Sequence, residues 1–217
     1  MENEIIMETR KYRLTGITPI LGSQPANPDV RTAYIESKAP DPAAATAEER
    51  ELLKYEDLDD KTLTVFLRDP KERDALMLMD YVILGYLKNA IDALKSQNHV
   101  KAAAGKVDKF VFAAPRHLFI LKDGKRIYDE DSVLERPLRA KTMQGDRVAL
   151  TASELIEDPW QIEVELTLLP NPEARTDGGS KAITFDVIEQ ALSLGRMKGL
   201  GQWRNGGYGR FTCERVG

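Results

Sequence analysis

The chain has 217 residues, of which 30% are charged and 42% apolar, and its net charge is −4 at pH 7. This length is enough for a sizeable hydrophobic core, and the composition is that of a soluble globular protein rather than a coat for nucleic acid. The charge is unevenly distributed, with eight acidic and two basic residues in 39–60 but five basic and one acidic in 195–215. A local basic site on an acidic protein is therefore expected.

The cysteine and histidine content excludes several kinds of site. A single cysteine, Cys213, excludes an intramolecular disulfide and a cysteine-rich zinc site. Two histidines, His99 and His117, leave little material for metal chemistry, so we expect no metal and no cofactor. No apolar run approaches the roughly 18 residues of a membrane span, and the N-terminus lacks the pattern of a signal peptide. We therefore expect a cytoplasmic protein.

The first sixty residues predict one strand followed by an insertion. Residues 5–21 indicate a long, basic first strand that ends in a Gly/Pro-punctuated extension. Residues 22–60 predict an insertion that is helical and flexible. Asn27 and Pro28 begin one short helix, and Thr46 with Glu49 form a capping box for an acidic helix over 47–57. Its acidic face is expected to be solvated; the alternative is that it repels or gates a polyanion.

The next segment predicts a hairpin and the best helix of the chain. Residues 62–67 and 75–79 are strand-like and are separated by a charged turn. Asp80 is expected to cap a helix over 81–97, in which apolar residues recur at helical spacing.

From Lys106 onward the pattern is almost entirely β until a last helix. Strands are expected over 110–112, 118–121, 133–143, 146–150 and 160–169, followed by an amphipathic helix over 184–197. This order predicts an α+β fold in a single domain over 1–217, with residues 22–60 as an insertion within it.

A glycine-rich loop at 199–211 is the most distinctive stretch. Five glycines alternate with aromatic residues and arginines. Arg204 and Arg210 suit phosphate groups, with the N–H groups of Gly201, Gly206 and Gly207 as further donors. Trp203 and Tyr208 suit stacking on bases, although Trp203 could equally be a packing anchor for the loop. The simplest alternative is a helix C-cap and a tight turn into an edge strand.

The loop resembles that of a known superfamily. Gly199-Leu200-Gly201, five residues, and then Gly207-Tyr208-Gly209-Arg210-Phe211 look like the C-terminal glycine-rich loop of the CRISPR-associated RAMP proteins. A second similarity lies in the middle helix, from Gly85 through Lys88 to Ile91. There Asn89 stands where that superfamily has glycine, and no arginine follows.

The resemblance implies a ferredoxin-like, RRM-related βαββαβ unit whose glycine loop and adjacent sheet face contact RNA. The residues expected to bind nucleic acid are Gly199, Gly201, Trp203, Arg204, Gly207, Tyr208, Gly209, Arg210, Lys88, Arg136 and Arg139. Arg136 and Arg139, with Arg116 and Lys141, form a second basic strip, for which the alternative is a solvated strand face.

Three functions remain open at this point. The first is non-catalytic binding of RNA or single-stranded nucleic acid, in homo- or hetero-oligomers with other RAMP-type subunits of a CRISPR-type or phage assembly. The second is a metal-independent endoribonuclease that uses His117. The alternative for His117 is that it is an ordinary strand residue without a catalytic role. The third is a protein-binding module, such as a phage factor that acts on a host complex through the acidic segment 39–60.

Overall fold

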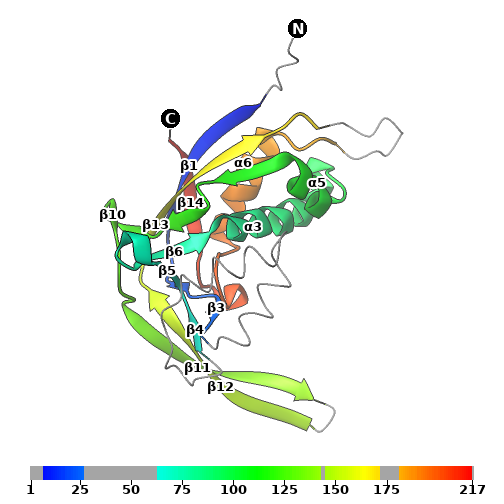
Figure 1. The fold of residues 1–217 in the computed structure, drawn as a ribbon. Coiled ribbons are helices and arrows are strands. Elements are labelled where there is room, and N and C mark those ends of the chain that lie inside the picture. Colours follow the sequence, from blue (N-terminus) through cyan, green and yellow to red (C-terminus); the bar gives the residue numbers. More distant parts are fainter. Residues whose placement is uncertain (1–6, 27–62, 143–144, 172–180, 217) are drawn as a thin grey trace.

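The structure is a computed structural model that describes residues 7–26, 63–142, 145–171 and 181–216 (Figure 1). Within these ranges, no helix is long and apolar enough to cross a membrane. The part of the insertion that was expected from residue 27 onward, with both its helices, lies outside the described residues.

An antiparallel sheet organises the fold around its first strand. β1 (Glu8–Gly16) pairs with β13 (Gln161–Leu168) on one side and with β14 (Phe211–Arg215) on the other. β7 (Val111–Ala114) pairs with the far side of β13, so that the order is β7-β13-β1-β14 with every pairing antiparallel. β9 (Leu121–Lys122) joins β13 near its start and carries β10 (Lys125–Arg126).

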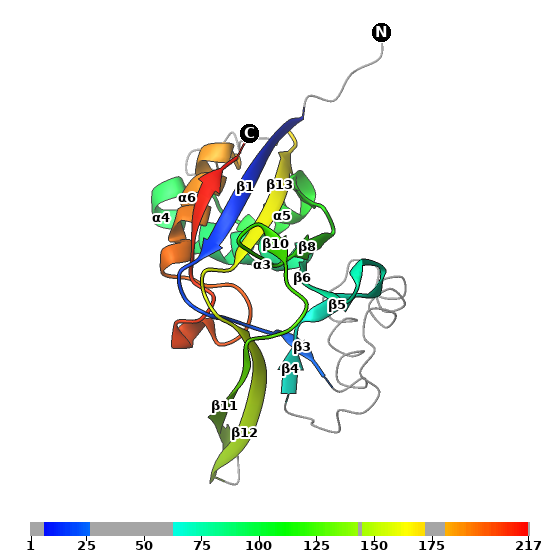
Figure 2. The same ribbon diagram turned by 90° about the vertical axis from the view of Figure 1, so that its left-hand side faces the viewer.

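Two helices cover one face of this sheet because its strands alternate apolar and polar side chains. Tyr12 and Leu14 of β1 and Val164 of β13 are buried in one core with α3 (Asp80–Ala93) and α6 (Phe185–Ser193). α4 (Lys95–Asn98) and α5 (Ala103–Phe110) follow α3 on the same side. Figure 2 shows the strands in front and the helices behind them.

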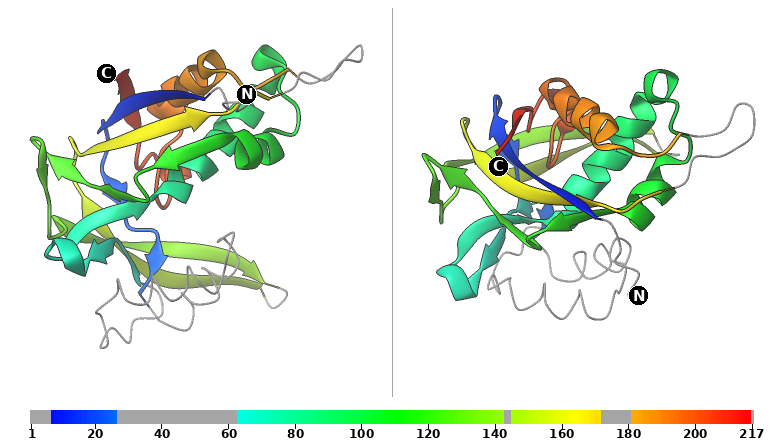
Figure 3. Two further views of the ribbon diagram at one scale, coloured as in Figure 1. Left: turned by 45° about the horizontal axis from the view of Figure 1, so that its top comes forward. Right: turned by 90° about the horizontal axis from the view of Figure 1, so that it is seen from above.

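A second sheet is dominated by a long hairpin. β11 (Ser132–Thr142) and β12 (Gly145–Ile156) pair along their whole length and extend away from the central sheet (Figures 1 and 3). Three short strands complete this sheet. β2 (Ile20–Leu21) and β4 (Leu63–Val65) pair with β12, and β3 (Gln24–Pro25) pairs with β4. A third sheet contains β5 (Leu67–Asp69), β6 (Ala75–Met79) and β8 (His117–Phe119).

A buried ion cluster fixes the base of the hairpin. Glu154 of β12 accepts two hydrogen bonds from the guanidinium of Arg68, at 2.9 and 3.2 Å, and one from the backbone N–H of Phe66 at 2.7 Å. Burial raises the pKa of Glu154, and its bonds to Arg68 oppose that rise. Arg68 also pairs with Glu130 at 2.8 Å. Removing one partner would leave a buried charge, so this cluster holds β5 and β12 together.

The α+β class and the last helix were expected from the sequence and are confirmed. A hairpin that ends in β6 was also expected, but its first strand is β5 and not the segment 62–67. The single strand expected over 62–67 is wrong. Its described part is split at Phe66, where β4 ends in one sheet and β5 begins in another. The N–H of Phe66 is used by the Glu154 carboxylate, which explains the break in the strand.

Two expectations about the helices are also corrected. The middle helix ends at Ala93, and Asp80 is its first residue rather than its cap: Met79 is the N-cap and supplies no side-chain bond. α5 begins at Ala103, and its last residues overlap the stretch from Lys106 onward for which only strands were expected. It buries only Ala103 and Val107, and so small an apolar face is not recognisable as a helical period.

Candidate nucleic-acid interface

The glycine-rich loop folds back against the segment that follows β1. The N–H of Leu200 donates to the carbonyl of Gly209 at 2.9 Å, and the N–H of Gly209 donates to the carbonyl of Pro19 at 2.7 Å. The backbones approach so closely that a Cβ at Gly199 would lie 2.0 Å from the Tyr208 carbonyl oxygen. A Cβ at Gly209, where φ is +70°, would lie 2.0 Å from the Leu200 oxygen. These two glycines are thus required by the loop's own packing.

Two of the backbone donors expected to meet phosphate are used inside the loop. The short 3-10 turn η3 (Arg204–Gly206) is closed by hydrogen bonds from Gly206 N–H to the Trp203 carbonyl and from Gly207 N–H to the Arg204 carbonyl, at 2.8 and 3.0 Å. An anion at the loop would therefore be held mainly by side chains.

The two aromatic residues of the loop stack on each other. The rings of Trp203 and Tyr208 are 5.2 Å apart and inclined by 15°, and the guanidinium of Arg136 lies over the Trp203 ring at 4.9 Å. Trp203 adopts a left-handed backbone conformation, and 41% of its surface is exposed. Since the ring already has a stacking partner, the packing-anchor interpretation of Trp203 is favoured over base stacking.

Arg136 joins the hairpin to this aromatic pair. It is buried, its Nη1 donates to the Ser153 hydroxyl at 2.9 Å, and its Nε has no hydrogen-bond partner among the described residues. Burial lowers the pKa of its guanidinium. The Nε of Arg210 is likewise buried without a partner in the described part of the chain. Two arginines of the expected site thus meet the loop, Arg136 from a strand 67 residues before Trp203.

Two other expected residues are not brought to the loop. Lys88 forms an ion pair with Asp108 of α5, so it faces the neighbouring helix. Arg139 belongs to β11, and its side chain lies outside the described part.

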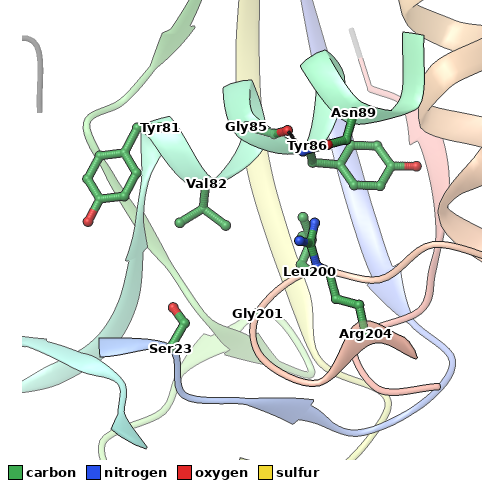
Figure 4. Close-up of a pocket in the computed structure, with 9 residues that line it drawn as sticks. All are labelled: Ser23, Tyr81, Val82, Gly85, Tyr86, Asn89, Leu200, Gly201 and Arg204. Carbon is green, nitrogen blue, oxygen red and sulfur yellow. Dashed lines mark hydrogen bonds between the residues drawn. The ribbon is translucent and has the colours of Figure 1, made fainter. Parts of the chain in front are cut away.

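A cavity of about 220 Å³ lies between α3 and the loop (Figure 4). α3 provides one wall, and the loop and the segment after β2 provide the other. In Figure 4, Val82 points from the helix into the space, and Arg204 extends from the loop toward the helix. The cavity is lined by Ser23, Tyr81, Val82, Gly85, Tyr86, Asn89, Leu200, Gly201 and Arg204.

A second hollow of about 160 Å³ adjoins the cavity, since both are lined by Asn89 and Arg204. Lys198, Met197 and Asn205 complete its lining. Among the described residues, no carboxylate lines either space, and neither Arg204 nor Lys198 has an ion-pair partner. We call the two spaces together the loop groove. Its two cations are therefore available to an anionic ligand.

Sequence reasoning missed most of the helix side of the loop groove. Gly85 and Asn89 stand in the segment that is similar to RAMP proteins. That they line a groove follows only from the packing of α3 on the loop, which the sequence does not show. Ser23 and Lys198 carry no sequence signal of their own.

The open face of the central sheet has a different electrostatic character. Lys11 pairs with Glu163 at 2.8 Å, and Arg13 pairs with Glu163 at 2.8 Å and with Glu214 at 3.1 Å. Hydrogen bonds from Lys11 and Arg13 lower the pKa of Glu163. The expectation that the sheet face contacts RNA therefore meets carboxylates that already neutralise its cations.

His117 belongs to this open side and not to the loop groove. Its Nδ1 lies 3.0 Å from Oδ2 of Asp69, a buried carboxylate that also accepts the N–H of Lys71 at 2.9 Å. His117 also lines a separate cavity of about 230 Å³, together with Lys11 and Glu163. Among the described residues, no group of three or more His, Cys, Asp and Glu side chains is placed to hold a metal ion.

Comparison with known proteins shows a likeness to solved structures and no match by sequence. No protein-family model matches the chain, and no curated protein matches it. A chain from the cryo-EM structure of the Type III-B Cmr-beta bound to cognate target RNA is similar in structure, with a TM-score of 0.41 and 8% sequence identity. The match covers 97% of this chain and 59% of the other, so this chain spans less than two thirds of the length of that chain. At this TM-score the likeness supports no argument about function.

Proposed function

We propose that this chain is a non-catalytic protein of RAMP type that binds RNA or single-stranded nucleic acid in the loop groove. The observation that carries the proposal is the pair of cations, Arg204 and Lys198, in a groove that no carboxylate of the described ranges lines, beside a glycine loop of RAMP pattern. A polyanionic strand gains affinity by neutralising its phosphates with such cations and releasing counterions.

We also propose that the central sheet with α3 and α6 forms a ferredoxin-like unit. The chain order β1, α3, β7, β13, α6, β14 reads βαββαβ, and the strand order β7-β13-β1-β14 with antiparallel pairing agrees with that unit. The remaining elements would be additions within a single domain over 1–217. Assembly with further RAMP-type subunits is part of the same proposal and follows from the resemblance of the loop.

The test is a fluorescence-anisotropy titration with single-stranded RNA and DNA of mixed sequence at about 50 and 200 mM salt. Binding should weaken as salt rises. Arg204→Ala should reduce affinity about tenfold, because a hydrogen bond to a charged group contributes about 1.5–3 kcal/mol. Lys125→Ala is the matched control: it removes one exposed charge from β10, away from the loop groove. No binding at low salt would overturn the proposal. An affinity of Arg204→Ala equal to that of the unaltered protein would overturn the location of the site.

A second candidate function rests on the contact between His117 and Asp69. A histidine oriented by a buried carboxylate has the arrangement of a general base, as an endoribonuclease that needs no metal would require. RNA cleavage that persists in EDTA and disappears in His117→Ala would favour it. RNA that remains intact during prolonged incubation would exclude it.

A further inference from the structure

We propose that the larger cavity of the loop groove holds one splayed nucleobase of the bound strand, while the adjoining hollow holds its phosphate. This inference rests on the proposed function and adds which part of the ligand each space accepts. Proteins that read single strands commonly insert unstacked bases into pockets and contact the backbone beside them.

The first support is the size of the cavity. Its volume of about 220 Å³ is below the range of about 300–1,000 Å³ that is usual for drug-sized ligands. A single heterocyclic ring system is the part of a nucleic acid that suits such a space. A phosphate alone would gain nothing from contact with the apolar wall that Val82 and Leu200 provide.

The second support is the chemistry of the walls. Val82 and Leu200 offer apolar contact to the faces of a ring, and Ser23 and Asn89 offer polar groups to its edge. The Nδ2 of Asn89 donates to the Gly85 carbonyl at 2.8 Å, which fixes its amide with Oδ1 as an acceptor. The wall is rigid at Tyr86, whose hydroxyl donates to the Ala191 carbonyl at 2.7 Å. A preformed wall of this kind lowers the cost of binding.

The third support is Gly85, in the interior of α3. Glycine at such a position destabilises a helix by about 1 kcal/mol relative to alanine. The packing of the protein does not require it, because a Cβ built at Gly85 meets nothing within 4 Å. The position nevertheless lines the cavity. A glycine that leaves the cavity open at this wall is explained by the close approach of a base to the helix backbone.

The fourth support is the arrangement of the two spaces. Asn89 and Arg204 line both, so a ligand group in the cavity and one in the hollow are neighbours. Lys198 lines the hollow but not the cavity. An apolar and polar space next to a cationic one reproduces the order of base and phosphate in one nucleotide.

The experiment fills the cavity without touching the cations. Gly85→Leu places a side chain in the space, and Gly105→Leu is the matched control, since a Cβ at Gly105 on α5 also meets nothing within 4 Å. Two probes are used, a single-stranded RNA of mixed sequence and inorganic polyphosphate of similar charge. Thermal melting verifies that both variants are folded, and Val82→Phe narrows the cavity from a second position should Gly85→Leu fail to fold.

Gly85→Leu should weaken RNA binding about tenfold, equivalent to about 1.4 kcal/mol, and leave polyphosphate binding within about twofold. Gly105→Leu should change neither, and Arg204→Ala should weaken both. RNA affinity unchanged in Gly85→Leu, or an equal loss for both probes, would overturn the base pocket while leaving the proposed function in place. Failure of the unaltered protein to bind RNA would instead overturn the proposed function.

Discussion

The loop groove and the open face of the central sheet carry the same kinds of cationic side chain but differ in how these are paired. On the sheet, Lys11 and Arg13 are bonded to Glu163, and Arg13 also reaches Glu214. In the loop groove, Arg204 and Lys198 have no ion-pair partner among the described residues. Basic residues therefore indicate a binding surface only where neighbouring carboxylates leave them available.

The two regions also differ in how they are built. The sheet face is a regular ladder in which register alone places opposite charges together, as in the pairings of Lys11 with Glu165 and of Arg13 with Glu163. The loop groove depends on a loop whose backbone approaches two other segments closely. It is consequently the region more sensitive to a single added carbon atom.

The largest expected effect comes from adding a Cβ atom to a glycine of the loop. Gly209→Ala should destabilise the protein by about 3 kcal/mol or more, since it combines a left-handed residue with a severe clash against the Leu200 oxygen. Urea unfolding would measure the change. Gly124→Ala is the control: its φ of +72° is nearly the same, but nothing lies within 4 Å. It should cost only about 1 kcal/mol. Equal effects of the two substitutions would show that the loop backbone shifts at little cost and relieves the clash with the Leu200 oxygen.

Removal of the stacked indole should have the next largest effect. Trp203→Ala loses an aromatic pair worth about 0.5–1.5 kcal/mol and a cation–π contact worth about 0.5–1 kcal/mol. We expect a loss of about 2 kcal/mol in unfolding free energy, with RNA affinity changed less than threefold in the folded variant. A large loss of affinity without a loss of stability would restore base stacking as the role of Trp203.

These two predictions mark what the sequence could and could not show. The loop pattern identified the glycines, but the roles of Gly199 and Gly209 depend on backbone carbonyls nine or ten residues away in the chain. The contact between Arg136 and Trp203 joins the β11–β12 hairpin to the loop, and no local sequence pattern predicts it. Periodicity located α3 and α6 because each buries a broad apolar stripe, whereas α5 does not.

The charge balance of the sheet face was likewise hidden. The strand containing Glu163 alternates acidic and apolar residues, which predicts a half-solvated strand correctly. The strand that pairs with it decides whether those carboxylates face solvent or cations. That pairing is a property of strand order, and local patterns do not determine it.

A third prediction removes the difference between the two regions. Glu163→Gln frees Lys11 and Arg13 from a shared carboxylate, so the sheet face should begin to attract RNA weakly. Anisotropy at low salt should show a two- to fivefold gain in affinity, with a steeper salt dependence than the unaltered protein. The same substitution combined with Arg204→Ala should retain that gain. An unchanged salt dependence would mean that shape, and not charge pairing, keeps RNA from the sheet.

The smallest expected effect is on the pH dependence of stability. Hydrogen bonds from Lys11 and Arg13 lower the pKa of Glu163 from its ordinary 4.5 in the folded protein. The folded state therefore holds the proton less tightly than the unfolded state, so these pairs stabilise the fold above pH 4.5 and cease to do so as the pH falls through the folded pKa. Because the pairs are partly exposed, the difference in unfolding free energy between the unaltered protein and Glu163→Gln should be at most about 1 kcal/mol at pH 7.

Urea unfolding at pH 7 and at pH 3.5 would measure that difference, which should shrink at the lower pH. Glu135→Gln is the control, since Glu135 is exposed and has no ion-pair partner in the described part of the chain. A difference for Glu163→Gln that persisted at pH 3.5 would mean that the ladder contributes by packing rather than by charge. Since no carboxylate in the described part of the chain lines the loop groove, the affinity of the groove for RNA should stay level over the range from pH 7 to 5. The response to pH thus separates a region whose charges hold the fold from one whose charges are free to hold a ligand.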